Sequence, residues 1–143
     1  MILVDINLLI YATSERTKQH RDARHWFEAL LNGSSRVGLP WACLLGYLRI
    51  TTNRRAFPDA ISMDKAWSQI DEWLSCDPVW IPQPTERHAA VLGSLCAHPG
   101  VHGDLISDAH LAALAIEHGL TLCSTDGDFA RFRGLKWMNP LAS

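Results

Sequence analysis

Residues 103–132 read GDLISDAHLAALAIEHGLTLCSTDGDFARF, and this stretch decides the fold. Apolar residues recur at helical spacing over 106–118, and Gly119 is a typical residue to end that helix. The apolar run 120–123 that follows has the length and composition of a buried strand. A helix that leads directly into a buried strand is the repeating unit of a parallel α/β sheet.

The rest of the chain repeats this alternation of short apolar runs with longer helical ones. Further strands are expected at 2–4, 37–39, 79–81 and 135–137. Further helices are expected at 7–13, 20–32, 40–53, 62–74 and 85–97, with Ser62 and Thr85 as caps of the last two. This order predicts an α/β fold, with a mainly parallel sheet of about five strands covered by helices on both faces.

The composition is that of an ordinary globular domain. The chain has 143 residues, of which 48% are hydrophobic and 20% charged, which excludes collagen, coiled coil and disorder as the main architecture. We therefore expect a single domain over residues 1–143. The formal net charge of −2 gives no support for binding to nucleic acid. The four cysteines form no C-x-x-C pair, and they favour buried free thiols in a reduced compartment.

The first residues, MILVDINLLIYA, are apolar without forming a signal peptide. They lack a cationic first segment, and Asp5 and Asn7 interrupt the apolar run. No stretch of the sequence approaches the length of a membrane span. A cytoplasmic location and no membrane partner are therefore expected.

Carboxylates follow the predicted strands where a site would form. Asp5 comes directly after strand 2–4, and Asp126 and Asp128 follow strand 120–123, whereas Asp108 lies in the first turn of helix 106–118. Sites of parallel α/β sheets lie beyond the carboxyl ends of the strands, so these acids are expected at one edge. Carboxylates that meet there repel one another unless a cation intervenes. An all-oxygen set suits Mg²⁺ or Mn²⁺, which can activate water.

Each acid also has a purely structural interpretation. Asp5 is able to cap the helix that follows it, and Asp108 favours a helix N-terminus electrostatically. Asp126 and Asp128 flank a glycine, which is typical of a turn. A rival zinc site made of histidines is not supported, because the sequence contains no H-E-x-x-H arrangement.

Three stretches resemble one known family, the PIN-domain nucleases. They are MILVDINLLIYA, residues 103–132 and the closing LKWMNPL. The resemblance spans essentially the whole chain and points to the VapC-type toxins of toxin–antitoxin pairs. It implies a three-layer α/β/α sandwich and a Mg²⁺- or Mn²⁺-dependent endoribonuclease. It also implies RNA as substrate, a cognate antitoxin protein that blocks the site, and a homodimer.

The resemblance assigns roles by position. Asp5 and Asp108 are the principal metal-binding carboxylates, and Asp126 and Asp128 complete or support the catalytic cluster, with Asp126 as a further metal ligand. Asn7 is expected to orient Asp5 by a hydrogen bond, and Thr125 to support the cluster in a similar way.

One departure from the family pattern lies on the helix at 40–53. The family usually carries a glutamate there, whereas this helix contains no acid and Gly46 stands near the expected position. Asp104, four residues before Asp108, is a possible extra ligand if the helix extends back that far, and a loop or cap acid otherwise. The missing acid leaves open a second interpretation, a weakened module that binds RNA or a partner protein without cutting. A phosphatase or a DNA-cleaving enzyme using the same acids is a third.

Arginines close to these acids in sequence offer a way to bind RNA despite the net negative charge. Arg54 and Arg55 follow the helix that lacks the acid, and Arg131 follows the Asp126–Asp128 pair. We expect these residues to hold phosphates. The alternative for any one of them is a solvated surface charge.

Overall fold

A five-stranded parallel sheet forms the centre of the computed structural model, which describes residues 1–142. The strands are β1 (Ile2–Val4), β2 (Val37–Gly38), β3 (Val79–Trp80), β4 (Thr121–Cys123) and β5 (Lys136–Met138). Their order across the sheet is β3-β2-β1-β4-β5, and every neighbouring pair is parallel. The predicted sheet is confirmed, and β1 stands at its centre.

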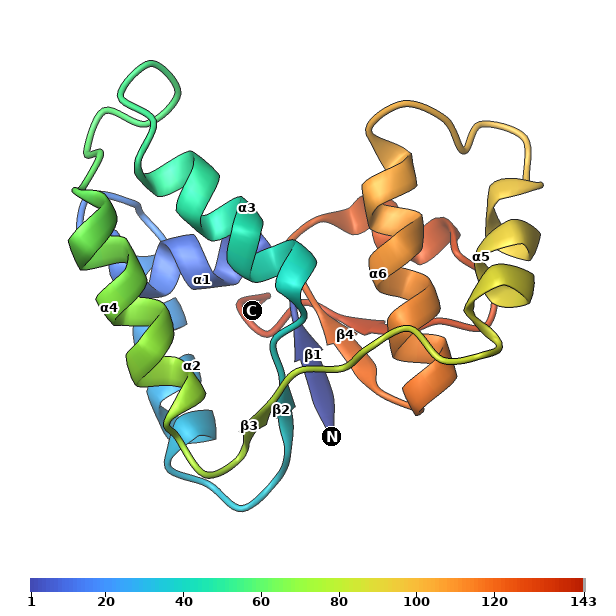
Figure 1. The fold of residues 1–143 in the computed structure, drawn as a ribbon, viewed down its shortest axis with the longest axis horizontal. Coiled ribbons are helices and arrows are strands. Elements are labelled where there is room, and N and C mark those ends of the chain that lie inside the picture. The colour runs from blue at the N-terminus through green and yellow to red at the C-terminus, as the bar shows by residue number, and fades with distance from the viewer. Residues whose placement is uncertain (143) are drawn as a thin grey trace.

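Helices cover the sheet from both sides, as the α/β/α prediction requires (Figure 1). One group comprises α1 (Ile6–Thr13), α2 (His20–Leu31), α3 (Trp41–Thr51) and α4 (Met63–Leu74). The other comprises α5 (His88–Cys96) and α6 (Leu105–His118). A short 3₁₀ helix, Gly127–Arg131, lies between β4 and β5. Among residues 1–142, no helix is long and apolar enough to cross a membrane.

The core forms where small and branched side chains let the layers approach each other. In α6, Ala109, Ala112 and Ala113 have no exposed surface, which allows this helix to pack closely beside β4. Leu3 and Leu122 are also fully buried in the sheet. α6 ends as predicted at Gly119, whose φ of 66° is left-handed and suits glycine at this position.

The register of β1 and β4 fixes the edge of the sheet where the site forms. Val4 is paired with Cys123, so the next residues, Asp5 and Ser124, emerge side by side. The Asp5 backbone N–H continues the ladder by donating to the Cys123 carbonyl at 3.0 Å. The carboxyl ends of neighbouring strands therefore deliver polar side chains to one place.

Local signals at the helix starts were predicted with mixed success. Ser62 caps α4 as expected, because its hydroxyl accepts a hydrogen bond from the Lys65 N–H. The predicted Thr85 cap is wrong: α5 begins at His88, and Thr85 instead donates to Glu117. Of the four cysteines, all free, Cys43 and Cys123 are buried and Cys76 and Cys96 are only partly buried.

Candidate active site

Asp5 combines both interpretations that its sequence position allows. It is the N-cap of α1, and its Oδ1 accepts a hydrogen bond of 2.8 Å from the Ile6 N–H. Its Oδ2 accepts a second one, also of 2.8 Å, from the Ser124 hydroxyl. Only 8% of Asp5 is exposed. Burial raises the pKa of Asp5, whereas these two hydrogen bonds act to lower it. The carboxylate is therefore held in one orientation at the end of β1.

Ser124 is a site residue that sequence reasoning missed. It is fully buried, and besides binding Asp5 its hydroxyl accepts a hydrogen bond of 3.0 Å from the Asp126 N–H. It thus links the carboxylate after β1 to the acidic segment after β4. Its only sequence signal was a polar residue at the end of a buried strand, and its meaning depends on the β1–β4 register.

Asn7 lies in the site, but the predicted hydrogen bond from Asn7 to Asp5 is not formed. Its side-chain amide donates to Thr125 Oγ1 at 2.9 Å and to Ser124 Oγ at 3.3 Å. Asn7 therefore positions the segment that in turn holds Asp5. Its own Oδ1 is buried and has no hydrogen-bond partner among the described residues. A buried acceptor without a partner is costly, so this atom favours a polar ligand at the site.

Asp108 projects from the first turn of α6 toward the same edge of the sheet. Partial burial, together with the negative charges of Asp5, Asp126 and Asp128, raises its pKa to about 6, and Arg131 acts in the opposite direction. These effects require the acids to lie near one another. The structure therefore brings together the carboxylates that the sequence placed on three separate segments.

Asp126 and Asp128 have further bonds of their own. Asp126 caps the 3₁₀ helix, because its Oδ1 accepts a hydrogen bond of 2.9 Å from the Asp128 N–H. The carboxylate of Asp128 is half-exposed and pairs with Arg131 at 3.2 Å. Asp126 also acts electrostatically on both Asp5 and Asp108. Of the two, Asp126 is thus the acid whose charge reaches both principal carboxylates.

The donor chemistry of the site fits a hard divalent cation. Carboxylate oxygens of Asp5 and Asp108 dominate it, and the charge of Asp5 contributes to the raised pKa of Asp108. The buried Asn7 Oδ1 has no hydrogen-bond partner among the described residues. In residues 1–142, however, no three acidic, histidine or cysteine side chains already converge into a metal-binding group. Protein oxygens would thus share the ion with water, as is usual for Mg²⁺.

α3 approaches the site where the family's glutamate was expected. A Cβ built on Gly46 would lie 1.9 Å from Ile6 Cδ1 and 3.2 Å from Ile6 Cγ1. Ile6, the residue after Asp5, therefore fills the space that a side chain at position 46 would need. The absence of the acid and the presence of Ile6 are one packing arrangement between α1 and α3.

This packing predicts a non-additive pair of substitutions. We expect Gly46→Glu alone to lower the unfolding free energy by about 2 kcal/mol, because it overpacks the α1–α3 contact. Adding Ile6→Ala opens that space, so the double variant should be about 1 kcal/mol more stable than the two single effects predict. Urea unfolding of the four proteins measures this coupling, and strictly additive effects would contradict it.

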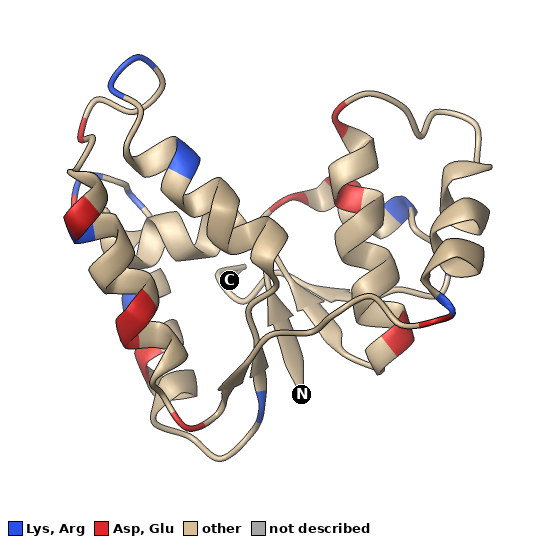
Figure 2. Cartoon of the chain, viewed as in Figure 1, with Lys and Arg blue, Asp and Glu red and all other residues tan. Residues whose placement is uncertain are grey.

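The remaining predicted residues lie outside the acidic cluster. Asp104 is exposed, occupies the N-cap position of α6 and makes no capping hydrogen bond with its side chain. Arg54 and Arg55 are exposed on the loop after α3, where the Arg55 N–H donates to Asn53 Oδ1. This basic loop projects away from the acidic segments at the start of α6 and after β4 (Figure 2).

His88 and His110 form a network separate from the acidic cluster. His110 Nδ1 lies 3.1 Å from His88 Nε2, and the other ring nitrogen of His88 contacts the buried carboxylate of Glu117. His118 instead contacts the Gln83 carbonyl at 2.7 Å. His88 and His110 therefore join α5 to α6 and are not part of the acidic cluster.

Comparisons with known proteins agree with this geometry. A family model described as PIN domain matches residues 2–135. Ribonuclease VapC37 from Mycobacterium tuberculosis is 37% identical over 142 residues, which cover 99% of each chain. Ribonuclease VapC43 from the same species is 40% identical over 141 residues, covering 99% of this chain and 96% of the relative.

Solved structures with the same fold have lower sequence identity. One is VapBC2 from Rickettsia felis bound to a DNA fragment from its promoter, with a TM-score of 0.70 at 19% identity, covering 97% of this chain and 98% of the other. Another is VapC20 from Mycobacterium tuberculosis, described as a toxin that cleaves the sarcin–ricin loop. Its TM-score is 0.68 at 16% identity, covering 95% of this chain and 99% of the other. Over nearly its whole length, the chain therefore has the fold of these proteins.

Proposed function

Because the chain belongs to the PIN-domain family, we propose that it is a divalent-metal-dependent endoribonuclease, the toxin of a toxin–antitoxin pair. Full-length relatives named ribonucleases support the activity. Toxin–antitoxin complexes with the same fold support the biological setting. In this proposal the substrate is RNA, the inhibitor is a cognate antitoxin protein, and the protein acts as a homodimer in the cytoplasm.

The observation that carries the proposal is the approach of Asp5 and Asp108. They come from β1 and α6, yet the charge of Asp5 contributes to the raised pKa of Asp108. The structural roles do not require this repulsion, since Asp5 caps α1 and Asp108 lies in the first turn of α6 independently of each other. Such costly pairs of carboxylates are typical of functional sites.

Each residue has a distinct part in the proposed site. Asp5 and Asp108 hold Mg²⁺ or Mn²⁺, with Asp126 as a further carboxylate. Ser124 orients Asp5, and Asn7 and Thr125 fix the segment that carries Ser124. When bound, the cation supplies a water of lowered pKa and offsets the charge of the phosphodiester.

The arginines near the site bind the phosphates of the RNA. Arg131 lies closest to the carboxylates, because it pairs with Asp128 and lowers the pKa of Asp108. Arg54 and Arg55 lie on the loop after α3. In this proposal they contact RNA phosphates farther from the cleaved bond. Their guanidinium groups suit phosphate oxygens, which accept two parallel hydrogen bonds.

Calorimetry and a cleavage assay test the proposal together. We expect the purified protein to bind Mn²⁺ and to cut total RNA when Mg²⁺ or Mn²⁺ is present but not in EDTA. Metal release should remove the cleavage without unfolding the chain, because its core does not depend on the site. Cleavage of equal extent in EDTA would contradict the metal-dependent mechanism.

A second candidate function follows from the contact between Ile6 and Gly46. Since Ile6 fills the place of the expected glutamate, the chain has fewer carboxylates at the metal than the family pattern provides. A module that binds RNA or a partner protein without cutting is the corresponding alternative. This alternative predicts that the protein binds RNA but gives no heat of Mn²⁺ binding that depends on Asp108. The same calorimetry, repeated with Asp108→Asn, therefore distinguishes it from the nuclease.

A further inference from the structure

One face of α3 borders the acidic cluster, and this helix supplies no acid to it. The thiol of Cys43 is fully buried, and besides burial the negative charges of Asp5 and Asp108 raise its pKa. Gly46, one turn farther along, packs directly against Ile6, the neighbour of Asp5. α3 therefore lies on the other side of the acidic segments from the start of α6 (Figure 2).

Arg49 places a positive charge on α3 beside the contact between Gly46 and Ile6. It lies three residues after Gly46, and its Nη2 is 4.0 Å from the point that a Cβ on Gly46 would occupy. The side chain thus runs back along α3 toward the end of the helix that lies nearest the sheet edge, as long helical side chains commonly do. Its guanidinium therefore lies beside the same contact that Ile6 and Gly46 make.

The guanidinium is free for a ligand. Arg49 is exposed, and it makes no ion pair with any described residue within 4.0 Å. A glutamate at position 46 would lie three residues before Arg49, at the spacing that favours an ion pair. Glycine at that position removes this competitor. In contrast, Arg131 on the other side of the cluster already pairs with Asp128.

We propose that Arg49 binds the RNA phosphate next to the one that is cut. The RNA then runs between the acids at the start of α6 and Arg49 on α3. This inference rests on the proposed nuclease function and adds a specific substrate contact to it. The acids would hold a cation that offsets the charge of the phosphate that is cut, and Arg49 binds the neighbouring phosphate by a forked pair of hydrogen bonds. The absence of the glutamate thereby becomes a feature of substrate binding.

Fluorescence anisotropy in EDTA tests the contact without cleavage. The probe is a labelled, mixed-sequence single-stranded RNA, titrated at several salt concentrations. We expect Arg49→Ala to weaken binding about tenfold at low salt. The slope of log affinity against log salt should fall by about 0.7, the value for one phosphate contact on a single strand.

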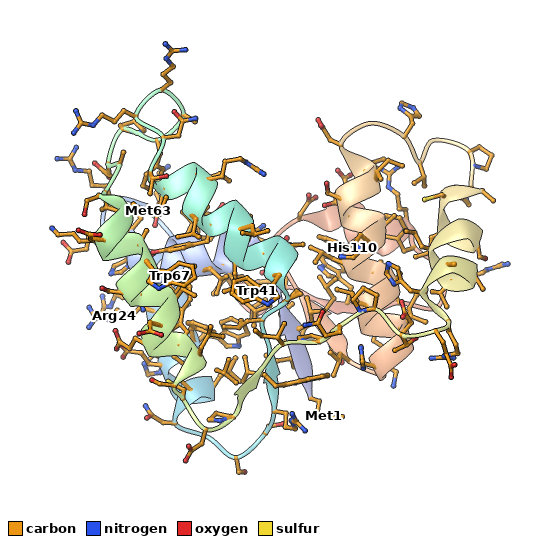
Figure 3. All side chains as sticks on the ribbon, viewed as in Figure 1. Met1, Arg24, Trp41, Met63, Trp67 and His110 are labelled. Atoms are coloured by element: carbon orange, nitrogen blue, oxygen red, sulfur yellow. The ribbon has the colours of Figure 1, made fainter. Side chains whose placement is uncertain are left out.

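Two further variants separate a phosphate contact from a structural effect. Arg49→Lys keeps the charge and loses the fork, so it should retain the salt slope and lose only part of the affinity. Arg24→Ala is the matched control, because Arg24 is an exposed arginine on α2 that pairs with Glu28 and is labelled in Figure 3 far from α6. It should match the wild type in both affinity and slope.

Cleavage kinetics with Mg²⁺ distinguish this inference from the proposed function. If the wild type cuts RNA, Arg49→Ala should raise KM more than it lowers kcat, because the contact exists before and during the reaction. Arg49 would have no role in RNA binding if Arg49→Ala had the KM of the wild type and, in EDTA, the same affinity and salt slope. That result would not affect the proposed nuclease function. A wild type that cuts nothing would overturn the nuclease, whereas a slope that depends on Arg49 would still support the phosphate contact.

Discussion

Asp108→Asn is expected to lower RNA cleavage at least about 100-fold while leaving the fold intact. The variant removes one of the two carboxylates that approach each other at the sheet edge, and an amide is a far weaker ligand for Mg²⁺ or Mn²⁺. Asp5→Asn should have a cleavage defect of similar size. Asp108 gives the cleaner test, because its side chain makes no hydrogen bond among the described residues, whereas Asp5 caps α1 and accepts from Ser124.

Asp108→Asn should also make the metal-free protein more stable. The pKa of Asp108 is raised to about 6 by burial and by the neighbouring acids, so its ionised form costs free energy in the folded state. This cost is absent below the pKa of the unfolded chain and is complete above about pH 6. Above that pH, Asp108→Asn should therefore raise the unfolding free energy by about 1 kcal/mol. The gain is modest because the side chain is partly exposed and solvent screens the repulsion.

Urea unfolding in EDTA and an RNA cleavage assay with Mg²⁺ measure both effects on one preparation. Asp71→Asn serves as the control, because Asp71 is an exposed acid on α4, outside the cluster. It should leave cleavage and stability unchanged. If Asp108→Asn cut RNA at the wild-type rate, Asp108 would not be a metal ligand. If it were less stable than the wild type at neutral pH, the proposed repulsion between the acids would be wrong.

The fold and the placement of acids at one edge of the sheet were predictable because they depend on local patterns. The helix at 106–118, its end at Gly119 and the strand after it follow from spacing and glycine chemistry alone, and the structure places them within a residue or two. Asp5 was predictable for a similar reason, since an acid at the end of a buried strand requires a partner. The shared sheet edge followed from the parallel order.

Contacts between elements were not predictable because they depend on register and packing. The sequence assigned Asn7 to Asp5, yet Ser124 makes that contact, because pairing of β1 with β4 sets Ser124 beside it. Nothing in the sequence showed that Ile6 fills the space above Gly46, since the two lie on different helices. The Thr85 cap failed for a similar reason, because the Thr85 N–H and hydroxyl donate to Glu117 on α6 and the helix begins only at His88.

Glu117 is the buried charge that the sequence did not reveal. Its side chain on α6 has no exposed surface. Its Oε1 accepts hydrogen bonds from the Thr85 N–H at 2.9 Å and from the Thr85 hydroxyl at 2.7 Å, and its Oε2 contacts His88. Burial alone would raise the pKa of Glu117, but these hydrogen bonds and the His88 charge hold it below its usual value. The carboxylate therefore fixes the segment before α5 to α6.

Glu117→Ala is accordingly expected to lower the unfolding free energy by about 3 kcal/mol, since it leaves buried donors without an acceptor. For a chain of this size, that corresponds to a fall in Tm of roughly 10 °C. Glu117→Gln, which keeps one acceptor for Thr85, should lose about half as much. Glu86→Gln, an exposed neighbour of Thr85, should change nothing measurable.

The pH dependence gives this prediction its sign. Because folding lowers the pKa of Glu117, its ionised form stabilises the fold above the pKa of the unfolded chain, and that contribution is lost as the pH falls through the folded value. The stability difference between wild type and Glu117→Gln should therefore be constant near neutral pH and shrink in acid. Thermal unfolding over a pH series measures it. A difference that stayed constant into acid would show that the ionised carboxylate is not what holds α5 to α6.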